Sequence, residues 1–307
     1  FNATGSAVVT IQGCTVDGSV SVNQGGLTLR NCTVDGDVTV ADAADGDLKA
    51  FHTNVGGSMS VTKGGLTLLK CTVDVDVTVI DTLGAANREL ETIVLQSTIV
   101  ERFVCKAKRS LTCYNLIRHA YFEGEVEITG NEFDGRSLYG IGIDVNGTTT
   151  FARIRNNHVK NYNAHANGPI IEQCIGIRIT GGARADIVNN LIHDCNDGQN
   201  GGSGTDCGMG VFVKEGSHAV ILGNVIWDCY VDAASALVRG NRLVYAPVST
   251  VVRHNILWKN NGDVDGALVG GGVTPSGTIN ADPKFVGGDP YDYHLQATSP
   301  AKDAGPP

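Results

Sequence analysis

The sequence predicts an all-β solenoid, in which short strands and turns repeat along one axis. Residues 25–40 (GGLTLRNCTVDGDVTV) return 39 residues later as residues 64–79 (GGLTLLKCTVDVDVTV), with 13 of 16 positions identical. Within each copy, leucine or valine stands at alternate positions, which is the pattern of a strand with one buried face. A repeat of this length can bury its apolar face only by stacking on its neighbours.

One position of the repeat serves as a register mark, in the pattern apolar–x–x–mark–x–apolar. The marks fall at Cys14, Cys32, Thr53, Cys71, Thr98, Leu116, Asn131, Asn157, Asn190, Asn224 and Asn255. Their spacing is 15 to 27 residues up to Asn131 and 31 to 34 residues from Asn157 onward, so the connections lengthen while the strands do not. Stacked asparagines hydrogen-bond from coil to coil. We therefore expect the last four marks to stack in one turn with their side chains inside.

The repeats predict a single domain over residues 1–307, because a solenoid lengthens without splitting. We expect short regular coils over residues 1–130, coils with long loops over residues 131–260, and a closing coil or cap over residues 261–307. Prolines and glycines in the last segment would protect the open end of the stack from edge pairing. No run of 18 apolar residues is present, so we expect no membrane span.

The charge distribution argues against nucleic acid as a partner. The net charge is −9, and no basic face is concentrated in the sequence. Residues 101–190 are the exception, with 11 Lys and Arg against 9 Asp and Glu, so this third could hold a polyanionic sugar. Its cluster of cations over residues 102–119 is more typical of a solvated face.

The nine cysteines suggest one bonded residue among several free ones. Cys195 and Cys229 each lie five residues beyond their marks, so they should stack at a distance that permits a disulfide. Cys207 is a rival partner for Cys195 across a loop. The sequence thus predicts that Cys195 is bonded, which implies an oxidising compartment, and that Cys14, Cys32 and Cys71 are free.

Three segments share a strand signature: residues 139–147 (YGIGIDVNG), 174–182 (CIGIRITGG) and 207–216 (CGMGVFVKEG). Their lead glycines, Gly142, Gly176 and Gly210, lie 15, 14 and 14 residues before the next mark, so the strands should stack. Alternation directs Asp144, Arg178 and Phe212 outward in one row, and Asn146, Thr180 and Lys214 outward in the next. It directs Ile141, Ile143, Val145, Ile175, Ile177, Ile179, Met209, Val211 and Val213 inward. Loops 161–174 and 195–207 would wall the outward face.

The asparagine coils, the GIxI strands and the tail DPKF…DYHLQ…SPAKDAG resemble the right-handed parallel β-helix superfamily of pectate-lyase-like secreted bacterial proteins. The resemblance covers nearly the whole chain. It implies a right-handed parallel β-helix of about eleven coils, with three sheets per coil and a polysaccharide groove lined by the GIxI strands. The motifs WxDH, GHG with RIK, and DPHE, which mark enzyme members, do not occur, so no catalytic residue is assigned by motif.

The groove residues would suit β-elimination of a uronic acid. This reaction needs a cation that neutralises the carboxylate, a base for the adjacent proton and a donor for the leaving oxygen. Arg178 suits the first role, and Lys214 or His165 suits the second. Asp144, Asn146 and Phe212 would contact substrate, while Glu172 and Asp206, with Asp144, could hold Ca²⁺. Alternatively, Asp144 and Arg178 form a simple ion pair across one coil. His158, His193 and His254 flank the marks and are expected to be hydrogen-bonding turn residues.

Two functions from different classes follow from this sequence. The first is a secreted or surface protein, extracellular in location, that binds acidic polysaccharide and would act as a polysaccharide lyase if the groove is catalytic. The second is a non-catalytic structural or adhesive rod, a fragment of a larger surface or appendage protein. Lateral or end-to-end self-association would suit either. The long loops favour the first function, and the near-identical repeats favour the second.

Overall fold

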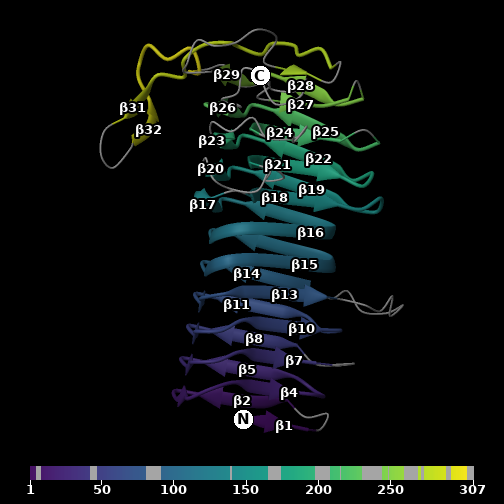
Figure 1. Ribbon diagram of the computed structural model, residues 1–307, viewed down its shortest axis with the longest axis vertical. Helices are drawn as coiled ribbons and strands as arrows, with labels where there is room; N and C mark the ends of the chain where they lie inside the picture. The colour runs from purple at the N-terminus through teal and green to yellow at the C-terminus, as the bar shows by residue number, and fades with distance from the viewer. Residues whose placement is uncertain are drawn as a thin grey trace. The chain divides into compact units, whose positions relative to one another are not determined.

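The computed structural model describes residues 1–4, 8–41, 47–80, 91–138, 140–164, 174–197, 208–214, 216–229, 244–247, 249–258, 269–270, 273–287 and 292–302. These ranges contain strands and turns but no helix, so the fold is all-β as predicted (Figure 1). The chain packs as two compact units. Unit 1 comprises Phe1–Phe133 with Val145–Ala152, and unit 2 comprises Asp134–Asp144 with Arg153–Pro307.

The strands of unit 1 are short at first and long at the end. They are β1 (Asn2–Ala3), β2 (Val9–Gln12), β3 (Thr15–Val16), β4 (Val20–Val22), β5 (Leu27–Arg30), β6 (Thr33–Val34), β7 (Val38–Val40), β8 (Leu48–Phe51), β9 (Asn54–Val55), β10 (Met59–Thr62), β11 (Leu66–Leu69), β12 (Thr72–Val73), β13 (Asp76–Ile80), β14 (Glu91–Leu95), β15 (Thr98–Cys113) and β16 (Leu116–Thr129). Three strands contain residues of both units: β17 (Glu132–Leu138), β18 (Gly140–Asn146) and β19 (Phe151–Arg155).

The strands of unit 2 repeat in the same way. They are β20 (His158–Ala164), β21 (Cys174–Thr180), β22 (Arg184–Val188), β23 (Leu191–Asp197), β24 (Met209–Val213), β25 (His218–Leu222), β26 (Val225–Trp227), β27 (Val244–Tyr245), β28 (Val251–Arg253), β29 (Ile256–Trp258), β30 (Val269–Gly270), β31 (Phe285–Gly287) and β32 (Asp292–Leu295).

Unit 1 is a parallel β-helix, because each strand pairs in parallel with its equivalent in the next coil. β2 pairs with β5, β5 with β8, and β8 with β11. Further along, β15 alone pairs with β12, β13 and β14, so one long strand replaces three short ones. It bends where the register shifts, between Ile99 and Arg102 and between Lys106 and Arg109.

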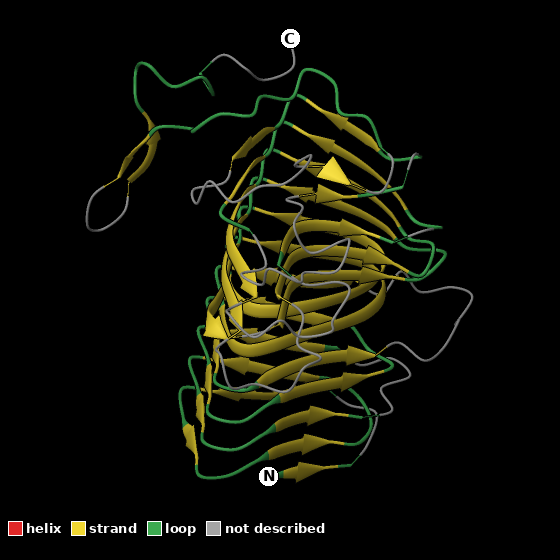
Figure 2. Cartoon of the chain, turned by 45° about the horizontal axis from the view of Figure 1, so that its top comes forward, coloured by secondary structure: helices red, strands yellow, loops and turns green. Residues whose placement is uncertain are grey.

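Unit 2 follows the same rule until its last strands. β20, β23, β26 and β29 form one parallel series, and β21, β24, β27 and β30 form another. β31 and β32 then pair antiparallel, and Figure 2 shows this hairpin beside the stacked strands of unit 2. The change of direction ends the parallel series, as expected for a closing segment.

The core of each unit consists of columns of apolar side chains at alternate strand positions. In unit 1 the fully buried columns include Val20, Val22, Val38, Val40, Met59, Val61, Val77, Val79, Phe103, Cys105, Ala120 and Phe122. These are the positions at which alternation in the sequence places apolar residues inside. The repeat is therefore explained by stacking, since each coil covers the apolar face of its neighbour.

The asparagine ladder in unit 2 confirms the predicted register. The backbone N–H and the side-chain Nδ2 of Asn157 both donate to Oδ1 of Asn190, each at 3.0 Å. Asn190 donates in the same way to Asn224, and Asn224 to Asn255. All four side chains are buried. The residue before a mark adopts a left-handed φ, 54° at Asn156 and 51° at His254, which turns the chain at each rung.

Two marks in unit 1 were wrong by one residue. Thr98 pairs with Thr72, the residue after Cys71, so the position equivalent to Cys71 is Ser97. The N–H of Ser97 donates to Oδ1 of Asn115, and the N–H of Asn115 donates to Oδ1 of Asn131, at 2.8 and 3.0 Å. The marks predicted at Thr98 and Leu116 therefore belong at Ser97 and Asn115. Ser97 and Asn115 lie in the turns just before β15 and β16, and the residue before each, Gln96 or Tyr114, adopts a left-handed φ as at the other marks.

Candidate functional site

The three glycine-containing strands stack as predicted. A Cβ atom on Gly142 would lie 2.7 Å from the carbonyl oxygen of Gly176, and one on Gly176 would lie 2.7 Å from the carbonyl oxygen of Gly210. The same two glycines face buried side chains, Tyr162 and Cys195 respectively, at distances that leave no space for a methyl group. Close approach of backbone to backbone is therefore the physical reason for the GIxI signature.

Phe212, predicted to point outward, is nonetheless buried. Ile175 and Met209, which are predicted to point inward, are fully buried and pack with Phe212 in one hydrophobic cluster, and Ile141 packs against it.

Arg178 and Asp144 form the ion pair that was the alternative explanation of this row. Nε of Arg178 donates to Oδ1 of Asp144 at 2.9 Å, and a terminal nitrogen donates to Oδ2 at 2.6 Å. The aspartate side chain is 10 % exposed and the arginine side chain 24 %. The two-pronged contact occupies the Nε–Nη2 edge of the guanidinium, one of the two edges that can bind a carboxylate with two hydrogen bonds. A uronate could reach this edge of Arg178 only by displacing Asp144.

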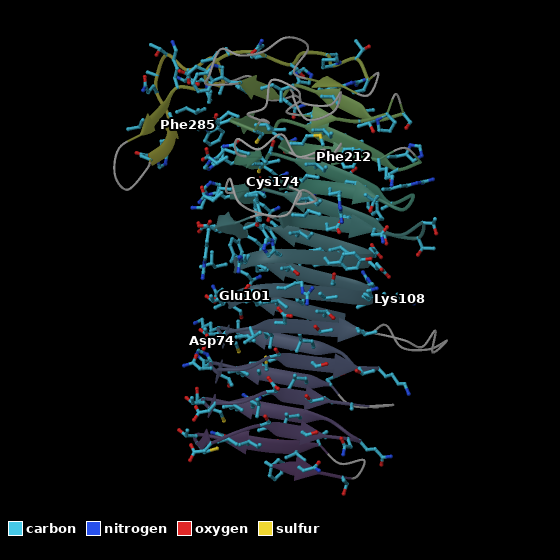
Figure 3. All side chains as sticks on the ribbon, in the orientation of Figure 1. Asp74, Glu101, Lys108, Cys174, Phe212 and Phe285 are labelled. Carbon is cyan, nitrogen blue, oxygen red and sulfur yellow. The ribbon has the colours of Figure 1, made fainter. Side chains whose placement is uncertain are left out.

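The other predicted contact residues do not form one site in unit 2. Phe212 is the register partner of Arg178, but it is only 2 % exposed and shows no open ring face to a ligand. Lys214 is exposed just after β24, and its N–H donates to the carbonyl of Ile179 at 2.9 Å. Figure 3 labels Phe212 and Cys174, which belong to the paired strands β24 and β21. Asn146 belongs to unit 1.

Several predictions lie outside the described residues. These are His165, Glu172, Asp206 and Cys207, in the ranges 165–173 and 198–207. Across the described ranges, no group of three or more His, Cys, Asp and Glu side chains could hold a metal ion. Asp144, the one predicted calcium ligand that is described, has both oxygens bonded to Arg178. The calcium site therefore stays a prediction.

A polar cluster around Tyr121 in unit 1 was missed. Its phenol donates to Oε1 of Glu123 and accepts a hydrogen bond from Nδ2 of Asn146 at 2.9 Å. Nζ of Lys106 lies 3.1 Å from the same carboxylate oxygen and 5.2 Å from the centre of the tyrosine ring. We call Tyr121, Glu123, Lys106 and Asn146 the tyrosine cluster. The alternating segment HAYFEG at 119–124 carries a signal for it, because Phe122 is inward and both its neighbours must be outward.

The hydrogen bonds of the tyrosine cluster fix its charges. Burial and the bond to Glu123 raise the pKa of Tyr121, so the phenol stays neutral. The bond to Glu123 also raises the pKa of Lys106. Burial tends to raise the pKa of Glu123, but the bonds from Tyr121 and Lys106 outweigh it and the pKa lies below its usual value. The cluster therefore holds one positive and one negative charge over the physiological range.

An aromatic column lies beside the asparagine ladder of unit 2. Nε2 of His158 is 2.8 Å from Nε2 of His193, whose ring stacks on Trp227 with centroids 4.0 Å apart. The ring of Phe285, from β31, lies 5.1 Å beyond Trp227. Nδ1 of His193 bonds Asp194 at 2.5 Å. Both histidines thus hydrogen-bond as expected, in a buried column rather than in simple turns.

Burial keeps His158 neutral. Nδ1 of His193 bonds the carboxylate of Asp194, and one of the two facing Nε2 atoms supplies the hydrogen between the rings. Burial, followed by the charge of His193, lowers the pKa of His158 to about 3, so His158 is neutral at pH 7. Burial tends to raise the pKa of Asp194, but the bond from His193 and the charge of that residue outweigh it and lower that pKa.

The predicted disulfide does not form. Neither Cys195 nor Cys229 is in a disulfide. The thiols of Cys195 and Cys229 point instead to the carbonyl oxygens two residues before them, at 3.5 and 3.2 Å. Burial and the adjacent thiol of Cys229 raise the pKa of Cys195 well above its usual value, which makes it a poor nucleophile. Cys14, Cys32 and Cys71 are free as predicted.

Comparisons with known proteins assign no family. No protein family matches the chain, and no curated protein or solved structure matches it either. In the part of the chain that is described, no helix is long and apolar enough to cross a membrane.

Proposed function

We propose that the protein is a secreted or cell-surface β-helix that binds polysaccharide through the outward face of its parallel strands in unit 1. One observation carries the proposal. On β13, β15 and β16 the outward side chains remain partly exposed and include Tyr121, whereas in unit 2 the outward Asp144 and Phe212 are buried. A flat face with strands about 4.8 Å apart suits an extended chain of sugars. The resemblance to pectate-lyase-like β-helices supports the same function.

The charges of unit 1 favour binding without elimination. Cations over residues 102–118 face carboxylates of the neighbouring coil: Arg102 with Asp76, Lys106 with Glu123, Arg109 with Glu125, and Arg118 with Glu101. Figure 3 shows Glu101 and Lys108 on opposite edges of their coil. Each of these pairs neutralises a charge that a polyanion would otherwise meet. The extracellular location rests on the proposed function, because the free cysteines give no support for an oxidising compartment.

Affinity electrophoresis in gels that contain neutral or uronate polysaccharides tests the proposal. We expect at least one polysaccharide to retard the protein by comparison with a gel that lacks it. A protein that migrates freely in every gel would overturn the binding function and leave the structural rod as the better explanation.

Acidic polysaccharide is the second candidate ligand, and one arrangement favours it. Arg178 already holds a carboxylate in two-pronged geometry, and the strand register places Lys214 opposite Thr180, on the same outward side. A uronate that displaced Asp144 would meet a guanidinium, and an amine would lie close by for proton abstraction. Incubation with uronate polysaccharides, with and without Ca²⁺, would then give an unsaturated product that absorbs in the ultraviolet. Full product formation by a Lys214→Ala variant would contradict the role of that amine.

A further inference from the structure

We propose that the tyrosine cluster of unit 1 is a binding subsite for a neutral pyranose unit of a polysaccharide. The inference rests on the proposed polysaccharide-binding function and names the class of sugar and the residues that bind it. Of its four members, only Asn146 is predicted from the sequence to contact substrate.

Strand register dictates that the cluster faces outward. Val104 pairs with Tyr121 and Lys106 pairs with Glu123, while the residues between them, Cys105 and Phe122, are fully buried. Side chains of a strand alternate between faces, so the ring, the amine and the carboxylate share the outer face. The side chains of Lys106 and Glu123 are 41 % and 36 % exposed, so a ligand can reach them.

The tyrosine ring is held in place before any ligand binds. Its hydroxyl is fixed between Glu123 and Asn146, and Asn146 is itself held by its carbonyl, which accepts a hydrogen bond from Thr150 at 2.6 Å. Thr150 in turn accepts a bond from the N–H of Gly124, on the strand of Tyr121. A ring fixed at both ends loses little conformational freedom when a sugar packs on it, which favours binding.

The remaining hydrogen-bonding capacity suits hydroxyl groups. Both bonds that Glu123 accepts from the described residues end on Oε1, so Oε2 can accept from a sugar hydroxyl. The ammonium of Lys106 has three hydrogens and can donate to a neighbouring hydroxyl oxygen. A pyranose carries adjacent hydroxyls that both donate and accept, and an apolar face of C–H groups that packs on the ring.

The charge of the cluster selects against uronates. A sugar carboxylate near Lys106 would also lie near the carboxylate of Glu123, which is only 3.1 Å from the amine. Repulsion from one therefore offsets attraction to the other, whereas a neutral hydroxyl pays no such penalty. This distinction separates the cluster from the Arg178 pair of unit 2.

The test compares variants of Glu123 with a matched variant of Glu125. Both glutamates lie on β16 and both pair with a cation of β15, but Glu125 contacts Arg109 at 3.7 Å. Affinities of the full chain are measured by isothermal titration for a neutral glucan, a galactomannan, a xylan and polygalacturonate. We expect Tyr121→Ala and Glu123→Gln to weaken binding of the neutral polymer at least tenfold, and Glu125→Gln to change it less than twofold.

Tyr121→Phe serves as a second variant if Tyr121→Ala does not fold. We expect it to weaken neutral-polymer binding about threefold, because the ring loses the hydrogen bonds of its hydroxyl. Circular dichroism confirms that each variant is folded. Wild-type affinity in Glu123→Gln and Tyr121→Phe, with binding by the parent chain intact, would overturn this inference alone. A parent chain that binds polygalacturonate but none of the neutral polymers would also overturn this inference. A parent chain that binds none of the polymers would instead overturn the proposed function beneath it.

Discussion

Unit 1 and unit 2 solve the same stacking problem with different register marks. The early coils of unit 1 use small side chains: the thiol of Cys32 contacts carbonyl oxygens of its own coil at 3.2 Å and of the preceding coil at 3.3 Å, and Thr53 bonds a carbonyl of its own coil at 3.0 Å. Unit 2 uses asparagines that bond the next coil twice. The same double bond joins Asn115 to Asn131 at the end of unit 1, across an advance of only 16 residues. The ladder therefore depends on the asparagine side chain and not on the length of the connection.

The outward faces of the two units also differ. In unit 1 the tyrosine cluster is partly exposed, while in unit 2 Asp144 and Phe212 are almost fully buried and Lys214 is exposed. Outward positions thus differ in exposure both between the units and within unit 2. Position in a strand fixes the direction of a side chain but not its exposure.

The largest expected effect comes from breaking the ladder. Asn190→Leu leaves the two donors of Asn157 without their acceptor and also removes the bond to the carbonyl of Ile154. Each buried group left without a partner costs about 1–3 kcal/mol, so we expect a total loss of roughly 3–6 kcal/mol. Cys32→Ala in unit 1 should cost about 1 kcal/mol, because it removes only weak thiol bonds and a small volume. Urea unfolding measures the loss of stability in each variant. Equal losses would show that the asparagine ladder is no stronger than the thiol contacts.

Acid should destabilise unit 2 through its histidine pair. The pKa of His158 falls from 6.5 to about 3 on folding, so the unfolded chain binds more protons between these values. Stability is therefore complete above about pH 6.5 and is lost as the pH falls towards 3, by roughly 2–4 kcal/mol. Burial contributes most to this shift in the pKa of His158. The charges of four neighbours contribute less: His193, Lys160, Asp134 and Asp194.

Hydrogen exchange measured peptide by peptide at pH 7 and pH 4 separates the two units. We expect protection of the strands around His158 and His193 to fall at pH 4 more than protection of β5 and β8. His158→Gln can still donate to His193, so it should reduce the acid effect. An identical pH response in the variant would show that another group causes it.

Ion pairs provide a third and smaller comparison. Arg178→Met leaves the nearly buried carboxylate of Asp144 without its partner, and we expect a loss of about 2–3 kcal/mol. Arg102→Met breaks a pair whose arginine is 59 % exposed, and we expect a loss below about 1 kcal/mol. Thermal unfolding at low and high salt distinguishes them, since only the exposed pair should be screened. A larger loss for Arg102→Met would mean that the outward face of unit 2 is accessible to water.

The smallest expected effect is that of a reducing agent. Cys195 and Cys229 are free, so dithiothreitol should leave the unfolding temperature unchanged. In the native state, an alkylating reagent should modify exposed Cys14 long before buried Cys195. Mass mapping without reduction that finds Cys195 in a disulfide would contradict the structure.

Features that depend on the spacing of the repeats could be predicted from the sequence. The repeat of residues 25–40 predicted parallel stacking, the asparagine spacing predicted the ladder of unit 2, and the glycine spacing predicted that Asp144 and Arg178 stand one coil apart. Each of these follows from counting residues along a regular stack. The count failed by one residue before β15 and before β16, where the marks are Ser97 and Asn115 and not Thr98 and Leu116.

The exposure and orientation of side chains could not be predicted from the sequence, because they depend on contacts between coils. Stacking brought Cys195 and Cys229 together, but their thiols turn to carbonyl oxygens, and spacing carries no information about rotamers. Phe212 is buried because Ile175 and Met209 pack with it, a contact between strands that the spacing does not show. The tyrosine cluster joins side chains from three strands, up to 40 residues apart in sequence, so no local pattern contains it. Local periodicity encodes register, whereas chemistry at the surface depends on contacts between coils.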